Sequence, residues 1–227
     1  MLLIIFSVIF GTAHCNAAQE LLPITDRCIV ECEHLPGGLS HNIIKYKTSL
    51  GNYYIFRQGK KRGNKDRFNR VVSIAQQVAK LQLAPYIYNF NDTHQQILMS
   101  YIPNVAWPSY EENEQPYGAT MHMLRKFHDG LRSEVLKSNP TTYQPFSAIL
   151  DREKYFIDDP NLPHQFKVAF DRVKISYEKV QPWLKTNATI YHGDLKKKNV
   201  LLEQKDDQLR PWLIDFEYAA VGHPYFD

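Results

Sequence analysis

The chain has 227 residues, of which 44% are hydrophobic and 22% are charged, and its formal net charge at pH 7 is +3. These values are ordinary for a globular protein with one or two domains. Two runs of basic residues, at positions 60–62 and 196–198, are short, and the remaining lysines and arginines are scattered. The composition therefore does not predict a nucleic-acid-binding protein.

An apolar prefix occupies residues 1–20. Its first ten residues are interrupted only by Ser7, and such a run is too short to cross a bilayer, which needs about 20 apolar residues. We therefore expect no stable membrane span. The run resembles the hydrophobic part of a signal peptide, and residues 15–17 suit a cleavage site, although no lysine or arginine precedes it. A buried or mis-assigned N-terminal segment is the alternative.

The next part of the chain alternates between strand-like and helical patterns. The predicted elements are, in order, strands at 43–48 and 53–57 with a turn at 50–52, a helix at 67–83, and strands at 86–90 and 96–102. In the helix, Val71, Ile74, Val78 and Leu81 recur at helical spacing, and Pro85 stops it. Two hairpins around a helix predict a small mixed or antiparallel sheet with one helix, which we assign to residues 21–103.

The rest of the chain is mainly helical. The predicted elements are a helix from about 117 with Met121, Leu124, Phe127, His128 and Leu131 on one face, a helix at 164–182 with Phe166, Phe170, Val173 and Tyr177 at compatible spacing, and strands at 189–191, 200–202 and 211–214. Pro103 and Pro108 interrupt the pattern, so we assign residues 104–227 to a second domain. The expected fold class is α+β with two lobes.

The most informative motif runs from His192 to Asn199. Asp194 and Asn199 are five residues apart, and Asp215 follows a later apolar strand. An aspartate that meets an attacking hydroxyl, with an asparagine and a second aspartate that hold magnesium ions, is typical of metal-assisted phosphoryl transfer. Taken one at a time, Asp194 would be interpreted as a turn residue, Asn199 as a strand cap and Asp215 as an exposed acid in a loop. His192 we interpret as a structural residue beneath the loop.

Two differences separate these motifs from those of protein kinases. Gly193 stands where protein kinases have an arginine, and Glu217 stands where their Asp-Phe-Gly motif has its glycine. The first argues against a protein kinase. The second favours a small cationic acceptor, because a quaternary ammonium offers no hydrogen bond and is held by carboxylates and aromatic faces.

Three segments can contact phosphate groups. Arg57 ends the second predicted strand, where a protein kinase carries its phosphate-binding lysine, and a guanidinium can bind phosphate oxygens through two hydrogen bonds. A surface arginine on an edge strand is the alternative. The glycines at 37–38 permit close approach of the backbone, but glycine pairs also simply make turns. The lysines at 196–198 can face a polyphosphate or form a solvated surface.

Residues 35–227 resemble the choline and ethanolamine kinases and, more distantly, the aminoglycoside phosphotransferases. The similar segments are 192–199 (His-Gly-Asp-x-x-x-x-Asn in the family), 213–219 with its Asp-Phe-Glu-Tyr, 37–42 (Gly-Gly-Leu-Thr-Asn in the family) and 124–128 (Leu-x-x-Leu-His in the family). The resemblance implies a bilobal protein-kinase-like fold. It also implies a set of roles: Asp194 as the catalytic residue at the substrate, Asn199 and Asp215 as Mg²⁺ ligands, Gly38, Ser40, Asn42 and Arg57 as ATP contacts, and Glu217 near the ammonium of the acceptor.

The chain departs from this family in two respects. Many relatives carry a glutamate on the first helix that pairs with the strand arginine or lysine, whereas the corresponding stretch here, residues 70–74, has no acid and the nearest is Asp66. The family pattern also continues beyond Asp227 into helices that supply much of the substrate pocket. We therefore expect an incomplete second lobe.

The expected function is ATP- and Mg²⁺-dependent transfer of phosphate to the hydroxyl of choline or ethanolamine, as in phospholipid biosynthesis, with a small molecule as partner. One alternative is another cationic acceptor, an aminoglycoside or thiamine. A second is a catalytically impaired pseudokinase, favoured by the missing helix acid. Because ATP is plentiful in the cytosol, we expect a cytoplasmic protein, with secretion as the alternative if the prefix is a working signal peptide.

Overall fold

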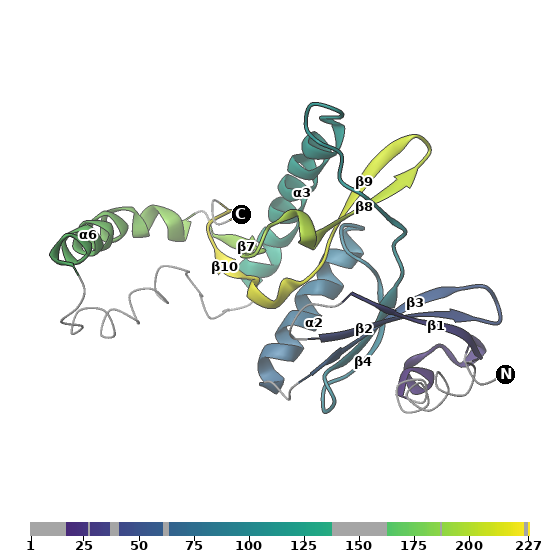
Figure 1. Ribbon diagram of the computed structural model, residues 1–227. Coiled ribbons are helices and arrows are strands. Elements are labelled where there is room, and N and C mark those ends of the chain that lie inside the picture. Colours follow the sequence, from purple (N-terminus) through teal and green to yellow (C-terminus); the bar gives the residue numbers. More distant parts are fainter. Residues whose placement is uncertain are drawn as a thin grey trace. The chain divides into compact units, whose positions relative to one another are not determined.

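A computed structural model describes residues 17–26, 28–36, 41–60, 64–137, 163–186, 188–224 and 227 (Figure 1). Most of the predicted apolar prefix, Gly38 and Ser40 lie outside these residues. The chain divides into two compact units, Met1–Pro116 with Val200–Glu217 and Tyr117–Asn199 with Tyr218–Asp227. Residues 200–217 thus group with the first unit, whereas the sequence assigned them to the second lobe. The lobe boundary near residue 103 stays a prediction.

The first unit contains a five-stranded antiparallel sheet. Its strands are β1 (Ile29–Leu35), β2 (His41–Thr48), β3 (Tyr53–Gly59), β4 (Ile87–Asn91) and β5 (Gln96–Ser100), in the spatial order β1-β2-β3-β5-β4. The predicted hairpin of β2 and β3 is confirmed, and Gly51 in its turn has a φ of 82°, a conformation that glycine adopts without steric cost.

The edge strand β1 was not predicted. Its central residues are exposed on both faces, so its sequence shows no apolar alternation. Its register with β2 is supported by two ion pairs, Glu31 with Lys47 at 2.9 Å and Glu33 with Lys45 at 3.1 Å. Charged side chains on an edge strand disfavour its pairing with the strand of another chain.

Apolar side chains cover both faces of this sheet. On one face Tyr46, Phe56 and Leu98 pack with Ala18, from the helical residues 17–21, and with Leu22, which follows them. On the opposite face, Val72 of helix α2 (Lys65–Lys80) packs with Ile87 and Ile97. Arg57 pairs directly with Ile97, so its side chain lies on the face that α2 covers.

Helix α2 begins and ends earlier than predicted. Asn64 is its N-cap, and the Asn64 side chain accepts a hydrogen bond from the backbone N of Arg67 at 2.9 Å. At its other end the helix stops at Lys80, and Gln82 has a left-handed φ of 59°. Leu81, predicted as part of the apolar face, is 38% exposed.

A buried carboxylate links the 3₁₀ turn η1 (Ile24–Asp26) to the β2–β3 hairpin. Asp26 accepts hydrogen bonds from Tyr54 Oη at 2.7 Å and from Asn52 Nδ2 at 2.9 Å. Burial alone would raise the pKa of Asp26, but hydrogen bonds from Thr48, Tyr54 and Asn52 together lower it below its ordinary value. Burial of the ring and, after it, the same carboxylate raise the pKa of Tyr54.

Replacing Asp26 with alanine is therefore expected to lower the free energy of unfolding by about 2 kcal/mol at pH 7, because Tyr54 and Asn52 lose their acceptor. A carboxyl with a depressed folded-state pKa stabilises the fold above its unfolded pKa, and this contribution is lost as the pH falls below about 4. Urea unfolding at pH 7 and pH 3 measures both effects. Asp129→Ala, on an exposed helix position, is the control. Equal pH dependence in the Asp26 variant and the wild type would contradict this role.

A second sheet of the first unit has the order β6-β8-β9, from β6 (Asn104–Val105), β8 (Val200–Lys205) and β9 (Gln208–Leu213). Asp206 and Asp207 form the turn with φ values of 47° and 59°, as in the type I′ turns of two-residue hairpins. The backbone N of Leu213 donates a hydrogen bond to the carbonyl of Leu83 at 2.8 Å. This bond holds the end of β9 beside the loop that follows α2.

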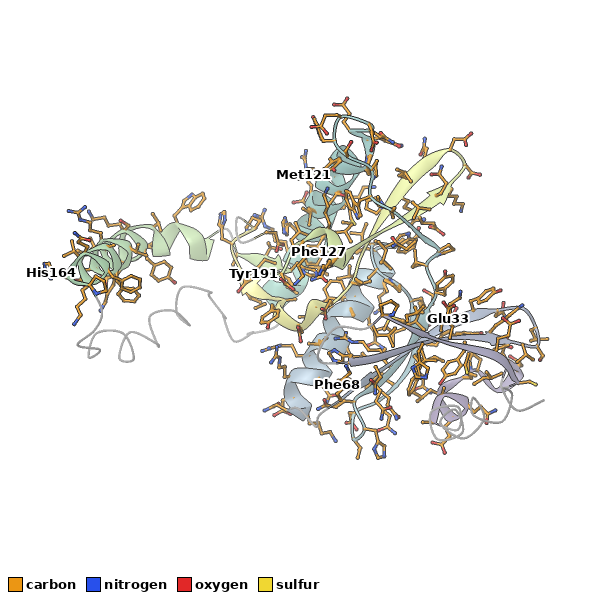
Figure 2. The ribbon with its side chains drawn as sticks, in the orientation of Figure 1. Glu33, Phe68, Met121, Phe127, His164 and Tyr191 are labelled. Carbon is orange, nitrogen blue, oxygen red and sulfur yellow. The ribbon has the colours of Figure 1, made fainter. Side chains whose placement is uncertain are left out.

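The second unit contains helices α3 (Gln115–Lys137) and α6 (His164–Thr186) and the paired strands β7 (Thr189–Tyr191) and β10 (Ala220–Gly222). The predicted apolar face of α3 needs one correction: Met121, labelled on this helix in Figure 2, is 67% exposed. Met123 is buried, as is Phe127. The predicted helix at 164–182 is present. Of its proposed apolar face, Tyr177 is buried, whereas Phe166 and Val173 are 46% and 44% exposed. Among the described residues, no helix is both long enough and apolar enough to cross a membrane.

Candidate active site

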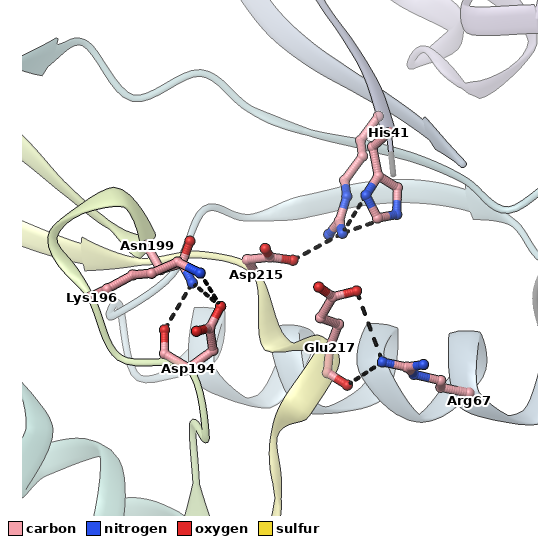
Figure 3. A network of polar contacts seen from close by, with 8 residues as sticks. His41, Arg67, Asp194, Lys196, Asn199, Asp215 and Glu217 are labelled. Atoms are coloured by element: carbon pink, nitrogen blue, oxygen red, sulfur yellow. Dashed lines mark hydrogen bonds and ion pairs between the residues drawn. The ribbon is translucent and has the colours of Figure 1, made fainter. Parts of the chain in front are cut away.

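The loop after β7 carries the first group of predicted site residues. Asn199, buried in the short turn η2 (Lys197–Asn199), donates from Nδ2 to the carbonyl of Asp194 at 2.8 Å and to its Oδ2 at 2.9 Å. Lys196 Nζ lies 2.6 Å from the same Oδ2 (Figure 3). The structure thus brings Asp194 and Asn199 into direct contact, and adds a lysine.

These contacts set the charge of Asp194. Burial raises the pKa of Asp194, but hydrogen bonds from Lys196 and Asn199, together with the positive charge of Lys196, hold it below its ordinary value. Its carboxylate therefore stays negative at neutral pH. Both donors use Oδ2, so Oδ1 is the oxygen on which a further donor can bind.

Gly193 meets a steric requirement of this loop. Its φ is 76°, and a Cβ atom there would lie 2.6 Å from the carbonyl oxygen of Tyr218 and 3.0 Å from Tyr191 Cε2. No side chain fits without movement of the backbone at Tyr218. The arginine that protein kinases carry at this position is thus incompatible with this loop.

Asp227 anchors the same loop from the end of the chain. Its Oδ1 accepts from the backbone N of His192 at 2.9 Å and of Gly193 at 2.8 Å, and its Oδ2 lies 2.9 Å from His128 Nε2. The Asp227 side chain is 1% exposed. His192 is fully buried, and the structural role assigned to it stays a prediction. The sequence showed Asp227 only as the end of a family pattern, so its role was missed.

For the phosphate transfer that the sequence predicts, replacing Asp227 with alanine is expected to lower kcat by about 10- to 100-fold with little change in the KM for ATP, because the loop loses its charged acceptor. Steady-state kinetics with thermal unfolding measure this effect. Asp171→Ala, on an exposed position of α6, is the control. A kcat for the Asp227 variant equal to that of the control would show that the loop keeps its shape without the carboxylate.

The second group of predicted site residues lies in the first unit. Arg57 NH2, from β3, is 3.0 Å from Asp215 Oδ1, with side chains that are 15% and 31% exposed. The same NH2 is 3.2 Å from Nδ1 and 3.1 Å from Nε2 of His41, at the start of β2 (Figure 3). Asn42 lies next to His41 and opposite Gln58 of β3. The sequence predicted neither the Arg57–Asp215 pair nor the contact with His41.

Asp215 has a strained backbone. It follows β9 with a φ of 68°, which costs a non-glycine residue roughly 1–2 kcal/mol. Such residues cluster at functional sites, where the surrounding structure holds them in place. Here Leu213 is hydrogen-bonded to Leu83 on one side, and Phe216 is buried on the other.

Glu217 has a cationic neighbour. Arg67 NH2, from the first turn of α2, lies 3.2 Å from the backbone carbonyl of Glu217 and 3.9 Å from its carboxylate Oε2 (Figure 3). The carboxylate contact is at the outer limit of an ion pair, so Glu217 can still attract a second cation. Arg67 carries no motif by which the sequence would have singled it out.

The oxygen atoms in these two groups of predicted site residues suit magnesium better than a metal ion held entirely by protein side chains. In the described part of the chain, no cluster of three or more His, Cys, Asp and Glu side chains is arranged to hold a metal ion. Magnesium needs only one or two carboxylates or amide oxygens, because waters and nucleotide phosphates supply its other ligands. Asn199 commits its amide nitrogen to Asp194, which leaves the amide oxygen as its possible ligand atom. Asn199 and Asp215, each taken by itself, therefore offer an oxygen atom of the kind that magnesium binds.

Comparisons with known proteins bear on the family and the fold of the chain. The sequence pattern of the phosphotransferase enzyme family matches residues 31–227. No curated protein matches the chain significantly.

Solved structures with the same fold include kinases and antibiotic-modifying enzymes. The choline kinase LicA from Streptococcus pneumoniae is 17% identical with a TM-score of 0.65, and the match covers 95% of this chain and 71% of LicA. A choline/ethanolamine kinase family protein from Mesorhizobium loti is 20% identical with a TM-score of 0.62, covering 94% and 67%. The macrolide 2′-phosphotransferase MphH from Brachybacterium faecium is 13% identical with a TM-score of 0.61, covering 95% and 74%. The predicted α+β kinase-like fold is confirmed.

Proposed function

The chain belongs to the phosphotransferase enzyme family, and on that premise we propose that it transfers the γ-phosphoryl group of ATP, with Mg²⁺, to the hydroxyl of choline or ethanolamine. The observation that carries this proposal is the geometry of Asp194. Its Oδ2 is held by Lys196 and Asn199, and its Oδ1 accepts the hydrogen bond of the acceptor hydroxyl. Because phosphoryl transfer passes through a loose transition state, the carboxylate acts mainly by orienting that hydroxyl.

Asn199 and Asp215 are the proposed magnesium ligands. The register of the β8–β9 hairpin supports this pairing: Val200 pairs with Leu213, so Asn199, which precedes Val200, and Asp215, which follows Leu213, leave the hairpin at the same end. A magnesium ion held there would supply positive charge that neutralises the charge of the nucleotide phosphates. Asn199 orients the ligand oxygen through its two hydrogen bonds to Asp194, and the strained backbone of Asp215 directs its carboxylate.

Arg57, Asn42 and the residues Gly38 and Ser40 are the proposed ATP contacts. Arg57 supports this role because it is only 15% exposed and already holds an anionic partner, Asp215. A guanidinium in such a place can exchange one oxyanion for another without losing its charge pairing. Since ATP is abundant in the cytosol, we propose a cytoplasmic site of action.

The acceptor class rests on Glu217. Its carboxylate is 28% exposed and only loosely paired with Arg67, so it can hold the ammonium of an amino alcohol. An aminoglycoside or thiamine also carries positive charge, and a fold shared with a macrolide phosphotransferase is compatible with a larger acceptor. We therefore propose choline or ethanolamine as the acceptor, and an assay with all four compounds distinguishes them from thiamine and an aminoglycoside.

The test is ADP release from Mg·ATP by the purified chain with choline, ethanolamine, thiamine or an aminoglycoside, each against a blank without acceptor. Release that depends on choline or ethanolamine supports the proposal, and a Glu217→Gln variant should raise the KM for that acceptor more than the KM for ATP. ADP release with only thiamine or the aminoglycoside would show that the acceptor is that compound and not choline or ethanolamine. ATP binding without release for any acceptor would identify a pseudokinase.

A further inference from the structure

Arg57, a proposed ATP contact, needs a guanidinium that is held in a fixed orientation. Its side chain shares the face of the sheet that α2 covers, because Arg57 pairs with Ile97 and Ile97 packs on Val72. Helix α2 has a single acid, Asp66, which lies in the exposed first turn. The helix therefore supplies no carboxylate beyond that turn to orient the guanidinium.

His41 contacts Arg57 through the face of its ring. Arg57 NH2 is nearly equidistant from Nδ1 and Nε2, at 3.2 and 3.1 Å. The lone pairs or N–H bonds of the two ring nitrogens lie in the ring plane and diverge, so one atom cannot be aligned with both. An NH2 group equally close to both nitrogens lies over the ring, in a cation–π arrangement.

The charge of His41 fits this arrangement. Burial, followed by the positive charge of Arg57, lowers the pKa of His41 to about 4. The ring is thus neutral at pH 7 and attracts the guanidinium without cancelling its charge. A glutamate in this position would orient the guanidinium and neutralise it, whereas His41 only orients it.

We propose that His41 is a positioning residue, which holds the Arg57 guanidinium toward the nucleotide phosphates in place of an acid on α2. This inference rests on the proposed function. The contacts of Arg57 with Asp215 and with His41, both among the described residues, differ in kind: the ion pair with Asp215 is open to exchange for a phosphate oxygen, and the contact with the His41 ring stays. The ring therefore keeps Arg57 in place while its anionic partner changes.

The experiment is titration of the folded chain with a fluorescent ADP in Mg²⁺ buffer, which reports binding without turnover. His41→Ala is expected to weaken ADP binding about tenfold, while His41→Phe, which keeps a flat aromatic face, stays within about threefold of the wild type. His41→Leu fills the space without a π face and should lose as much as His41→Ala, so the test holds even if the alanine variant fails to fold. His34→Ala, on the exposed strand β1, is the matched control.

A double-mutant cycle separates positioning from direct contact with the nucleotide. In an Arg57→Met background, His41→Leu is expected to cause no further loss, because the guanidinium that the ring orients is gone. An equal loss in both backgrounds would overturn the inference, as would wild-type affinity in both His41→Leu and His41→Ala. A wild-type chain that binds no ADP would overturn the inference and the proposed function together, whereas normal binding by the His41 variants leaves the proposed function intact.

Discussion

Replacing Asp194 with asparagine is expected to lower the rate of phosphate transfer by about 10³-fold. Asparagine has nearly the same shape, so contacts with Lys196 and Asn199 can be rebuilt in part. The negative charge that accepts the hydrogen bond of the acceptor hydroxyl is lost. Nucleotide affinity should change by less than about threefold, because Asp194 is not a proposed ATP contact.

Single-turnover rates and the ADP titration measure the two effects separately. Asp206→Asn is the matched control, because it makes the same chemical change at an exposed turn residue with a left-handed φ of 47°, a conformation that asparagine tolerates. A rate for the Asp194 variant within tenfold of the control would contradict the assignment of Asp194 as the catalytic residue.

Replacing Gly193 with alanine is expected to have the second-largest effect, a loss of about 2–5 kcal/mol in the free energy of unfolding with at least a tenfold loss of rate. The new Cβ would lie 2.6 Å from the carbonyl oxygen of Tyr218, and moving that backbone costs about 1–3 kcal/mol. The φ of 76° adds roughly 1–2 kcal/mol for a residue other than glycine. The displaced loop also moves Asp194.

Gly118→Ala is the control for this substitution. Gly118 lies in helix α3, and a Cβ there meets nothing within 4 Å. Alanine in a helix is more stable than glycine by roughly 0.5–1 kcal/mol, so the two variants should shift the urea midpoint in opposite directions. Equal midpoints for Gly193→Ala and the wild type would show that the loop accommodates a side chain.

Local sequence patterns predicted the elements whose apolar residues recur at a regular period. The β2–β3 hairpin and helix α2 were found in this way, because Tyr54 and Phe56 alternate along a strand and Val71, Ile74 and Val78 follow one helix face. Strand β1 was missed, since Glu31 and Glu33 are paired with lysines of β2 rather than buried. On α3, Met121 was predicted to be buried because it lies three residues before Leu124, whereas the buried residue at this end of the stripe is Met123, four residues before Phe127.

Contacts within the site were predictable between residues that are close in the sequence, and not between distant residues that only the fold brings together. Asp194 and Asn199 are five residues apart, and the loop brings them into contact. By contrast, Arg57 and Asp215 meet only because β3 and the end of β9 are brought together in the first unit. The contacts of Asp227 also join residues that are distant in the sequence: its hydrogen bonds to His192 and Gly193 require that β10 pairs with β7. The predicted roles of all these residues in catalysis stay predictions.

The most direct test of the proposed reaction is ³¹P NMR of Mg·ATP with choline and catalytic amounts of the chain. We expect the γ-phosphate signal of ATP to be replaced by that of a phosphomonoester on choline, and this product to be absent with Asp194→Asn. Inorganic phosphate as the sole product, or an unchanged ATP spectrum with each of the four acceptors, would contradict a kinase that acts on a small cationic alcohol.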